Sequence, residues 1–137
     1  MAEANNKKVL VVEDDEALLS VMADSFTIEG FTVFSAANGA SGLELALKEH
    51  PDIILLDIQM PVMDGLEMLD KLRQDDWGGR AEVILLTNFS DMDKVAKAAE
   101  KGAYDYLVKS DWKTEDIIKK VKNKLGLAEA RAAIDVN

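Results

Sequence analysis

Asp57 is the residue whose position most strongly suggests chemistry. It closes the apolar run Ile53–Leu56, and the stretch that follows is broken by Pro61 and by Asp64-Gly65. In an open α/β sheet, ligands bind at the carboxyl ends of the strands. A carboxylate that ends a buried strand is therefore expected to lie in a site.

Three other expected strands end in polar residues that reach the same edge. Glu13 and Asp14 follow the first strand, Thr87 ends the fourth, and Lys109 follows the fifth. We expect parallel strands here, so their carboxyl ends lie together. The sequence thus predicts three carboxylates, one hydroxyl and one ammonium at a single place.

The three carboxylates define what such a site needs. At ~4 Å and an effective dielectric near 20, each pair repels by a few kcal/mol, so the site calls for a cation or for a protonated acid. An all-oxygen set of ligands suits Mg²⁺. Zinc is disfavoured because the single histidine, His50, precedes a strand and belongs to the opposite end of the sheet.

The remaining groups fit phosphoryl chemistry. A lysine, a hydroxyl and Mg²⁺ can together surround the oxygens of a phosphoryl group. An aspartate is already an anionic nucleophile at neutral pH and needs no general base. We therefore expect phosphoryl transfer onto Asp57, which would give an aspartyl phosphate.

Alternating strand and helix patterns supply the frame for this site. Continuous apolar runs at 9–12, 53–56 and 83–86 are typical of parallel strands buried on both faces, and 31–35 and 104–108 read as edge strands. Apolar residues at helical spacing separate them: Leu18, Met22 and Phe26; Leu43, Ala46 and Leu47; Leu66, Leu69 and Leu72; Met92, Val95, Ala96 and Ala99; and Ile117, Ile118, Val121 and Leu125. The pattern predicts a single doubly wound (βα)5 domain with a parallel sheet.

Local signals mark the ends of these elements. Gly30, Gly102 and Gly126 are expected to stop helices, and Asp91 and Thr114 are expected as N-caps. The fourth helix is rich in alanine and should bury the least area. His50 is expected to be an exposed residue at a helix end.

Composition narrows the class of protein. The chain has 137 residues, no cysteine and a net charge of −10, with 6 basic and 17 acidic residues up to position 90 and 10 and 9 beyond it. Disulfides and thiolate chemistry are excluded, and the acidic first part argues against nucleic-acid binding. The basic cluster at 119–124 fits a solvated helix face, and no apolar run approaches the ~18 residues of a membrane span.

Four motifs in order resemble the receiver domain of response regulators in two-component signalling. They are Val11-Val12-Glu13-Asp14, Leu55-Leu56-Asp57 with the following Met60-Pro61-Val62-Met63-Asp64-Gly65, Leu86-Thr87, and Gly102-Ala103-Tyr104-Asp105-Tyr106-Leu107-Val108-Lys109. The resemblance covers about residues 8–125. It implies a flavodoxin-like fold with strand order 2-1-3-4-5.

The resemblance also implies roles for individual residues. Asp57 would be the phosphoacceptor, and Lys109 would contact the phosphoryl group. Glu13, Asp14 and Asp57, with the backbone carbonyl of Gln59, would hold Mg²⁺. Thr87 and Tyr106 would form a switch that alters the surface of the fourth helix, fifth strand and fifth helix.

Two departures from the family pattern keep an alternative open. Ser110 stands where receivers usually have proline, so a cis peptide is not expected and Lys109 could be held less firmly. Asn88 stands where a small residue is usual. A receiver-like adaptor that works without phosphorylation is therefore an alternative, and a hydrolase is a more remote one because Gln59 replaces the second acid that it would need.

The expected organisation and partners complete the prediction. We expect a disordered segment at 1–7, a receiver domain at 8–126, and a C-terminal extension or truncated linker at 127–137. The protein would be a cytoplasmic signalling switch that catalyses only its own phosphorylation and dephosphorylation. Its partners would be a sensor histidine kinase or histidine phosphotransfer protein and a downstream protein, with a possible homodimer and no nucleic acid or membrane.

Overall fold

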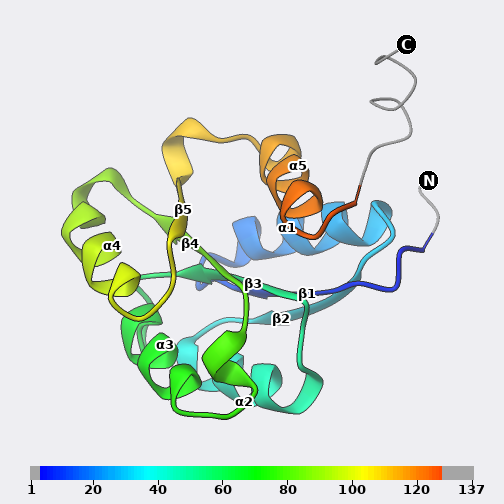
Figure 1. Cartoon of the computed structure of the whole chain (residues 1–137). Helices are drawn as coiled ribbons and strands as arrows, with labels where there is room; N and C mark the ends of the chain where they lie inside the picture. Colours follow the sequence, from blue (N-terminus) through cyan, green and yellow to red (C-terminus); the bar gives the residue numbers. More distant parts are fainter. Residues whose placement is uncertain (1–3, 128–137) are drawn as a thin grey trace.

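A five-stranded parallel sheet lies at the centre of the computed structural model, which describes residues 4–127 (Figure 1). The strands are β1 (Lys8–Val12), β2 (Thr32–Ala36), β3 (Ile53–Asp57), β4 (Val83–Thr87) and β5 (Asp105–Val108). The helices are α1 (Glu16–Ile28), α2 (Gly39–Glu49), α3 (Gly65–Arg73), α4 (Met92–Ala99) and α5 (Thr114–Lys124). The strand order is β2-β1-β3-β4-β5, which confirms the predicted fold.

Helices cover both faces of this sheet. Figure 1 shows α1 and α5 on one face and α2, α3 and α4 on the other. The alternation of side chains along the strands divides the core accordingly. Leu10, Val12, Ile54 and Leu56 face the α2–α4 side, whereas Val9, Val11, Ile53 and Leu55 face α1 and α5. Central strands buried on both faces explain the continuous apolar runs in the sequence.

The ends of the elements agree with the sequence in most places. Gly30, Gly102 and Gly126 all have positive φ, at 96°, 81° and 72°, as expected for residues that end helices. His50 is exposed, ends α2 with a φ of 48°, and stacks on Trp77 with ring centroids 4.3 Å apart. Asp15 caps α1 by accepting the backbone N–H groups of Ala17 and Leu18.

Some expectations at element ends were wrong. Thr114 is the first residue of α5 rather than its N-cap. The cap position belongs to Lys113, whose N–H donates to Asp116 at 3.2 Å.

The buried face of α4 also differs from the prediction. In α4 the buried alanine is Ala98, whereas Ala96 is exposed. Alanine contributes little apolar area, so it does not define which face of a helix is buried.

The structure describes only part of the segments predicted at the two ends of the chain. Residues 1–3 and 128–137, which include most of the predicted C-terminal extension, lie outside the described residues. Asn5 donates its backbone N–H to the Gly30 carbonyl at 3.1 Å just before β1. None of the helices within residues 4–127 is long and apolar enough to cross a bilayer.

Candidate functional site

The carboxyl ends of β1 and β3 place two acids side by side. Val12 of β1 pairs with Leu56 of β3, so Glu13 and Asp57 occupy matching positions one residue further on. Asp14 is exposed beside them, and one carboxylate oxygen from each of the three lies within 4.8 Å of the others. The prediction that these acids meet at one edge of the sheet is confirmed.

Lys109 lies among these acids. Its Nζ is 2.6 Å from Glu13 Oε1 and 3.1 Å from Asp57 Oδ2. All peptide bonds of the described residues are trans, and residues Lys109–Asp111 form a 3₁₀ turn after β5. The replacement of proline by Ser110 therefore leaves the ammonium in contact with both carboxylates.

Burial makes the two inner carboxylates unusual. Glu13 is fully buried and Asp57 is only 3% exposed. Burial, followed by the hydrogen bond and the negative charge of Glu13, raises the pKa of Asp57 to about 8, and Lys109 only partly offsets this. Burial also lowers the pKa of Lys109, but Glu13 and Asp57 outweigh that effect and raise it overall.

A hard divalent cation fits this arrangement. Glu13 Oε1 is buried and, apart from the Lys109 ammonium, has no hydrogen-bond partner among the described residues. Two buried carboxylates share one ammonium, and the exposed third carries a further negative charge. Three carboxylates with no nitrogen or sulfur ligand match the preference of Mg²⁺, so Glu13, Asp14 and Asp57 are suited to hold it.

Thr87 ends β4 on the other side of β3. Its side chain is fully buried, and its Oγ1 donates a hydrogen bond to the Asn88 carbonyl at 3.0 Å. Asp57 pairs with Leu86, so Thr87 lies one residue beyond the phosphoacceptor candidate in the sheet register. The Asn88 side chain is exposed, and the chain departs from the family pattern here without displacing Thr87 from the strand end.

Tyr106 lies further from this edge. It is 39% exposed on β5, where it pairs with Leu85 of β4. Its neighbour Tyr104 is 79% exposed just before the strand, which begins at Asp105 rather than at the expected Tyr104. Aromatic side chains thus lie on the exposed flank of the edge strand.

The segment after Asp57 is held by close backbone contacts. Gly65 donates its N–H to the Ile58 carbonyl, and a Cβ at Gly65 would lie 2.3 Å from the Asp57 carbonyl oxygen. Gly39 of α2 donates to the Met63 carbonyl, and a Cβ there would lie 2.3 Å from that oxygen. Only glycine fits at either position, so the 58–64 loop is fixed from two directions.

Gln59 in this loop contacts the start of α4. Its Nε2 donates to Asp91 Oδ1 at 2.8 Å. Asp91 is the residue before α4, as expected for an N-cap, but its side chain makes no capping bond to the helix backbone. Neither residue type nor spacing indicates this contact, because it depends on how two loops approach each other. The position of the Gln59 carbonyl as a metal ligand stays a prediction.

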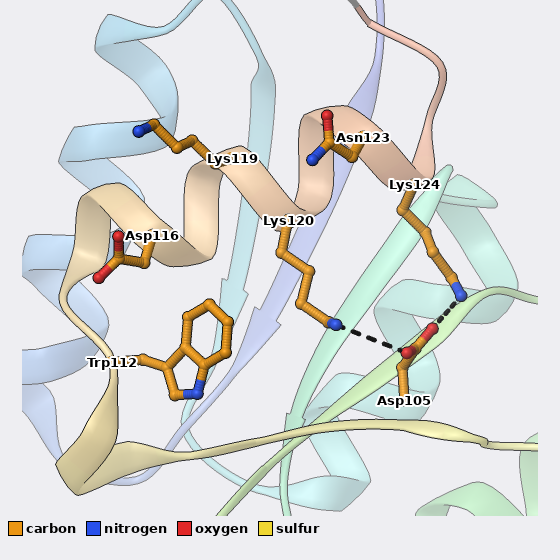
Figure 2. A pocket seen from close by; sticks show the side chains of 7 residues that line it. All are labelled: Asp105, Trp112, Asp116, Lys119, Lys120, Asn123 and Lys124. Carbon is orange, nitrogen blue, oxygen red and sulfur yellow. Dashed lines mark hydrogen bonds and ion pairs between the residues drawn. The ribbon is translucent and has the colours of Figure 1, made fainter.

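The basic cluster of α5 borders a hollow of about 440 Å³ (Figure 2). Figure 2 shows Lys120 and Lys124 reaching from α5 to Asp105 of β5, with Trp112 beside Lys120. Lys122 pairs with Glu29, the residue that follows α1. The prediction of a solvated helix face holds for Lys119 and Lys124, which are exposed, but Lys120, Lys122 and Lys124 also form ion pairs that link α5 to its neighbours.

Comparison with known proteins identifies the class. Residues 9–122 match the model of the response regulator receiver domain, and the chain belongs to this family. It is 36% identical to sporulation initiation phosphotransferase F of Bacillus subtilis, over 76% of this chain and 82% of that protein. Several other curated relatives are longer, and the matches cover 22% to 55% of their length.

Solved structures agree with this assignment. A CheY-like response regulator receiver domain protein from Methanospirillum hungatei superposes with a TM-score of 0.79 at 29% identity, covering 89% of this chain and 95% of that one. The CheX-CheY-BeF3-Mg²⁺ complex from Borrelia burgdorferi contains a chain with a TM-score of 0.76 at 28% identity. That match covers 87% of this chain and 89% of its counterpart.

Proposed function

We propose that this receiver domain is a phosphorylation switch in which Asp57 accepts a phosphoryl group from a phosphohistidine. The observation that carries the proposal is the Asp57 carboxylate, buried at the end of β3 beside two further acids and within 3.1 Å of the Lys109 ammonium. The donor would be a sensor histidine kinase or a histidine phosphotransfer protein. The protein would then act in the cytoplasm, together with its donor.

The proposed reaction moves one phosphoryl group between two protein side chains. A carboxylate oxygen of Asp57 bonds to phosphorus while the bond from phosphorus to the donor's imidazole nitrogen breaks. The donor ring carries a proton on its other nitrogen, so it leaves as neutral imidazole. When bound by Glu13, Asp14 and Asp57, with the Gln59 carbonyl as a proposed further ligand, Mg²⁺ would supply positive charge for the phosphoryl oxygens and would favour the ionised form of Asp57, whose pKa burial and Glu13 otherwise raise to about 8. Lys109, whose Nζ is 3.1 Å from Asp57 Oδ2, supplies a second positive charge.

Thr87 and Tyr106 are the proposed readout of this reaction. A phosphoryl group brings negative charge and acceptor oxygens to the strand edge. The Thr87 hydroxyl would exchange its bond to the Asn88 carbonyl for a phosphoryl oxygen. Movement at Thr87 would then change the position of half-exposed Tyr106 on the adjacent strand.

The proposed output surface is formed by α4, β5 and α5. Exposed Tyr104, half-exposed Tyr106 and Trp112, and the hollow beside α5 in Figure 2 all lie on or next to it. A downstream protein, or a second phosphorylated copy of the chain, would bind there. The protein would catalyse only its own phosphorylation and dephosphorylation.

Lys109 also bears on the alternative of an adaptor that is never phosphorylated. That hypothesis rests on Ser110 and Asn88, which could have displaced the reacting groups. Lys109 nevertheless contacts both buried carboxylates, and Thr87 ends its strand as expected. The geometry supports phosphorylation.

The test is the intact mass of the protein after incubation with Mg²⁺ and a small acyl phosphate. We expect a gain of one phosphoryl group that requires Mg²⁺, is prevented by a chelator, and is absent in Asp57→Asn. Exposed Asp76→Asn is the matched control and should gain the group normally. Phosphorylation that persists in Asp57→Asn would refute the assignment of the phosphoacceptor.

A further inference from the structure

Asp91 is a buried acid that the proposed phosphorylation chemistry does not use. It is 5% exposed, stands immediately before α4, and makes no bond to the helix backbone with its side chain. Its Oδ1 accepts from Gln59 Nε2 at 2.8 Å, and Lys94 Nζ lies 3.7 Å from the same oxygen. It is unusual for a buried carboxylate at the start of a helix to accept a hydrogen bond from a neutral amide on another loop and none from the helix backbone.

The bond between these two side chains joins the loops on either side of the phosphoacceptor. Gln59 is two residues beyond Asp57, and Asp91 is four residues beyond Thr87. β3 and β4 are adjacent and parallel, so both loops leave the sheet at the edge that carries the site. The hydrogen bond therefore ties the Gln59 side chain to α4 beside the phosphoryl position.

The hydrogen bond between Gln59 and Asp91 matters because of what a glutamine amide can do near a phosphoryl group. A glutamine near a phosphoryl group can orient the water that attacks phosphorus. Gln59 is exposed, and the bond from its Nε2 to Asp91 holds its side chain at the start of α4, so its amide oxygen is not free to move toward such a water. We propose that Asp91 is a positioning residue that restrains Gln59 and so prolongs the lifetime of the aspartyl phosphate.

The affected step is hydrolysis of the phosphorylated protein, so the inference rests on the proposed function. Water oxygen bonds to phosphorus, and the bond between phosphorus and the Asp57 oxygen breaks. The products are the free Asp57 carboxylate and inorganic phosphate, which keeps the protons of the water. The inference concerns only how often a water is correctly oriented for this step.

The experiment measures loading and decay separately on the full chain. Each variant is loaded with a small acyl phosphate and Mg²⁺, and loading is read by intact mass. The donor is then removed and decay is followed. We expect Asp91→Ala to lose its phosphoryl group several-fold faster than the unchanged protein, whereas Asp91→Asn, which keeps an acceptor oxygen, should restore the slow decay.

Two further variants separate restraint from general loosening. The double variant Gln59→Ala with Asp91→Ala should decay at the rate of Gln59→Ala alone, because no amide remains to be released. Asp93→Ala removes an exposed acid from the same turn of α4 and should decay at the unchanged rate. If Asp91→Ala does not fold, Gln59→Asn shortens the reach while keeping the amide, and it should also decay faster.

The outcomes that overturn the inference are distinct from failure of the proposed function. If the unchanged protein is never loaded, the proposed phosphorylation of Asp57 and the proposed role of Asp91 are both refuted. If loading is normal but Asp91→Ala decays at the unchanged rate, only the role of Asp91 falls. The same conclusion follows if removing Asp91 speeds decay equally when Gln59 is already alanine.

Discussion

Replacing Asp57 by asparagine should stabilise the metal-free protein. The side chain is 3% exposed and lies beside fully buried Glu13, with one ammonium, from Lys109, shared between them. Asparagine keeps the shape and removes one buried negative charge. Glu13 and Lys109 then remain as a one-to-one ion pair.

The size of the effect follows from the pKa of Asp57. Its ordinary value is 3.8, and burial with the neighbouring Glu13 raises it to about 8 in the folded chain. Folding therefore favours the protonated acid, and the free energy of unfolding falls as the pH rises from about 4 to about 8. At ~1.4 kcal/mol per unit of pKa, the ceiling is roughly 4 kcal/mol at pH 7, and relaxation of the site reduces it to about 2–4 kcal/mol.

The assay is urea unfolding, followed by far-ultraviolet circular dichroism, between about pH 4.5 and about pH 8.5 with a chelator present. The unchanged protein should lose stability across this range, whereas Asp57→Asn should lose much less and be about 2–4 kcal/mol more stable near pH 7. Excess Mg²⁺ should narrow or reverse the difference, because a ligand that binds only the folded state stabilises it. Exposed Asp76→Asn should follow the unchanged protein.

One result would refute this reasoning. If Asp57→Asn is no more stable than the unchanged protein at pH 7 without metal, and both show the same dependence on pH, Asp57 is not the desolvated acid. The raised pKa would then have to be assigned elsewhere. The phosphorylation proposal would survive, since it depends on the position of Asp57.

Three other substitutions test separate features. Lys109→Met leaves the buried carboxylate of Glu13 without its ammonium and should lower the metal-free free energy of unfolding by about 3–5 kcal/mol, as measured by denaturation, with partial recovery in Mg²⁺. Gly65→Ala places a Cβ 2.3 Å from a backbone oxygen and should cost at least ~2 kcal/mol, whereas Gly79→Ala, whose nearest atom is at 3.5 Å, should be nearly neutral in the same assay. Asp15→Ala removes the cap of α1 and should lower the melting temperature through a loss of about 1 kcal/mol.

Much of the fold could be predicted because strands buried on both faces have continuous apolar sequences. The runs in β1, β3 and β4 identified the strands whose ends carry Glu13, Asp57 and Thr87, and parallel pairing then brings those ends together. The prediction was weaker where side chains carry little apolar area. Alanines in α4 left its buried face undefined, and Ala98 was missed.

The contacts between residues far apart in the sequence could not be predicted for a different reason. The bonds from Gln59 to Asp91 and from Lys124 to Asp105 join residues 32 and 19 positions apart, on elements that pack only in the folded chain. Neither residue type nor spacing reports such an approach. The Thr87 hydroxyl likewise donates to the Asn88 carbonyl, which depends on the local backbone path rather than on sequence pattern.

The close glycine contacts around the 58–64 loop bear on the direction in which a signal can travel. The loop is fixed against α2 through Gly39 and against its own strand end through Gly65. A structural change at Asp57 would therefore move this loop very little. On the opposite flank Thr87 has a rotatable hydroxyl, and α4 buries a single residue. Because the 58–64 loop is rigid, the displacement caused by a new phosphoryl group would be transmitted mainly toward β4, α4 and β5 instead of equally in both directions.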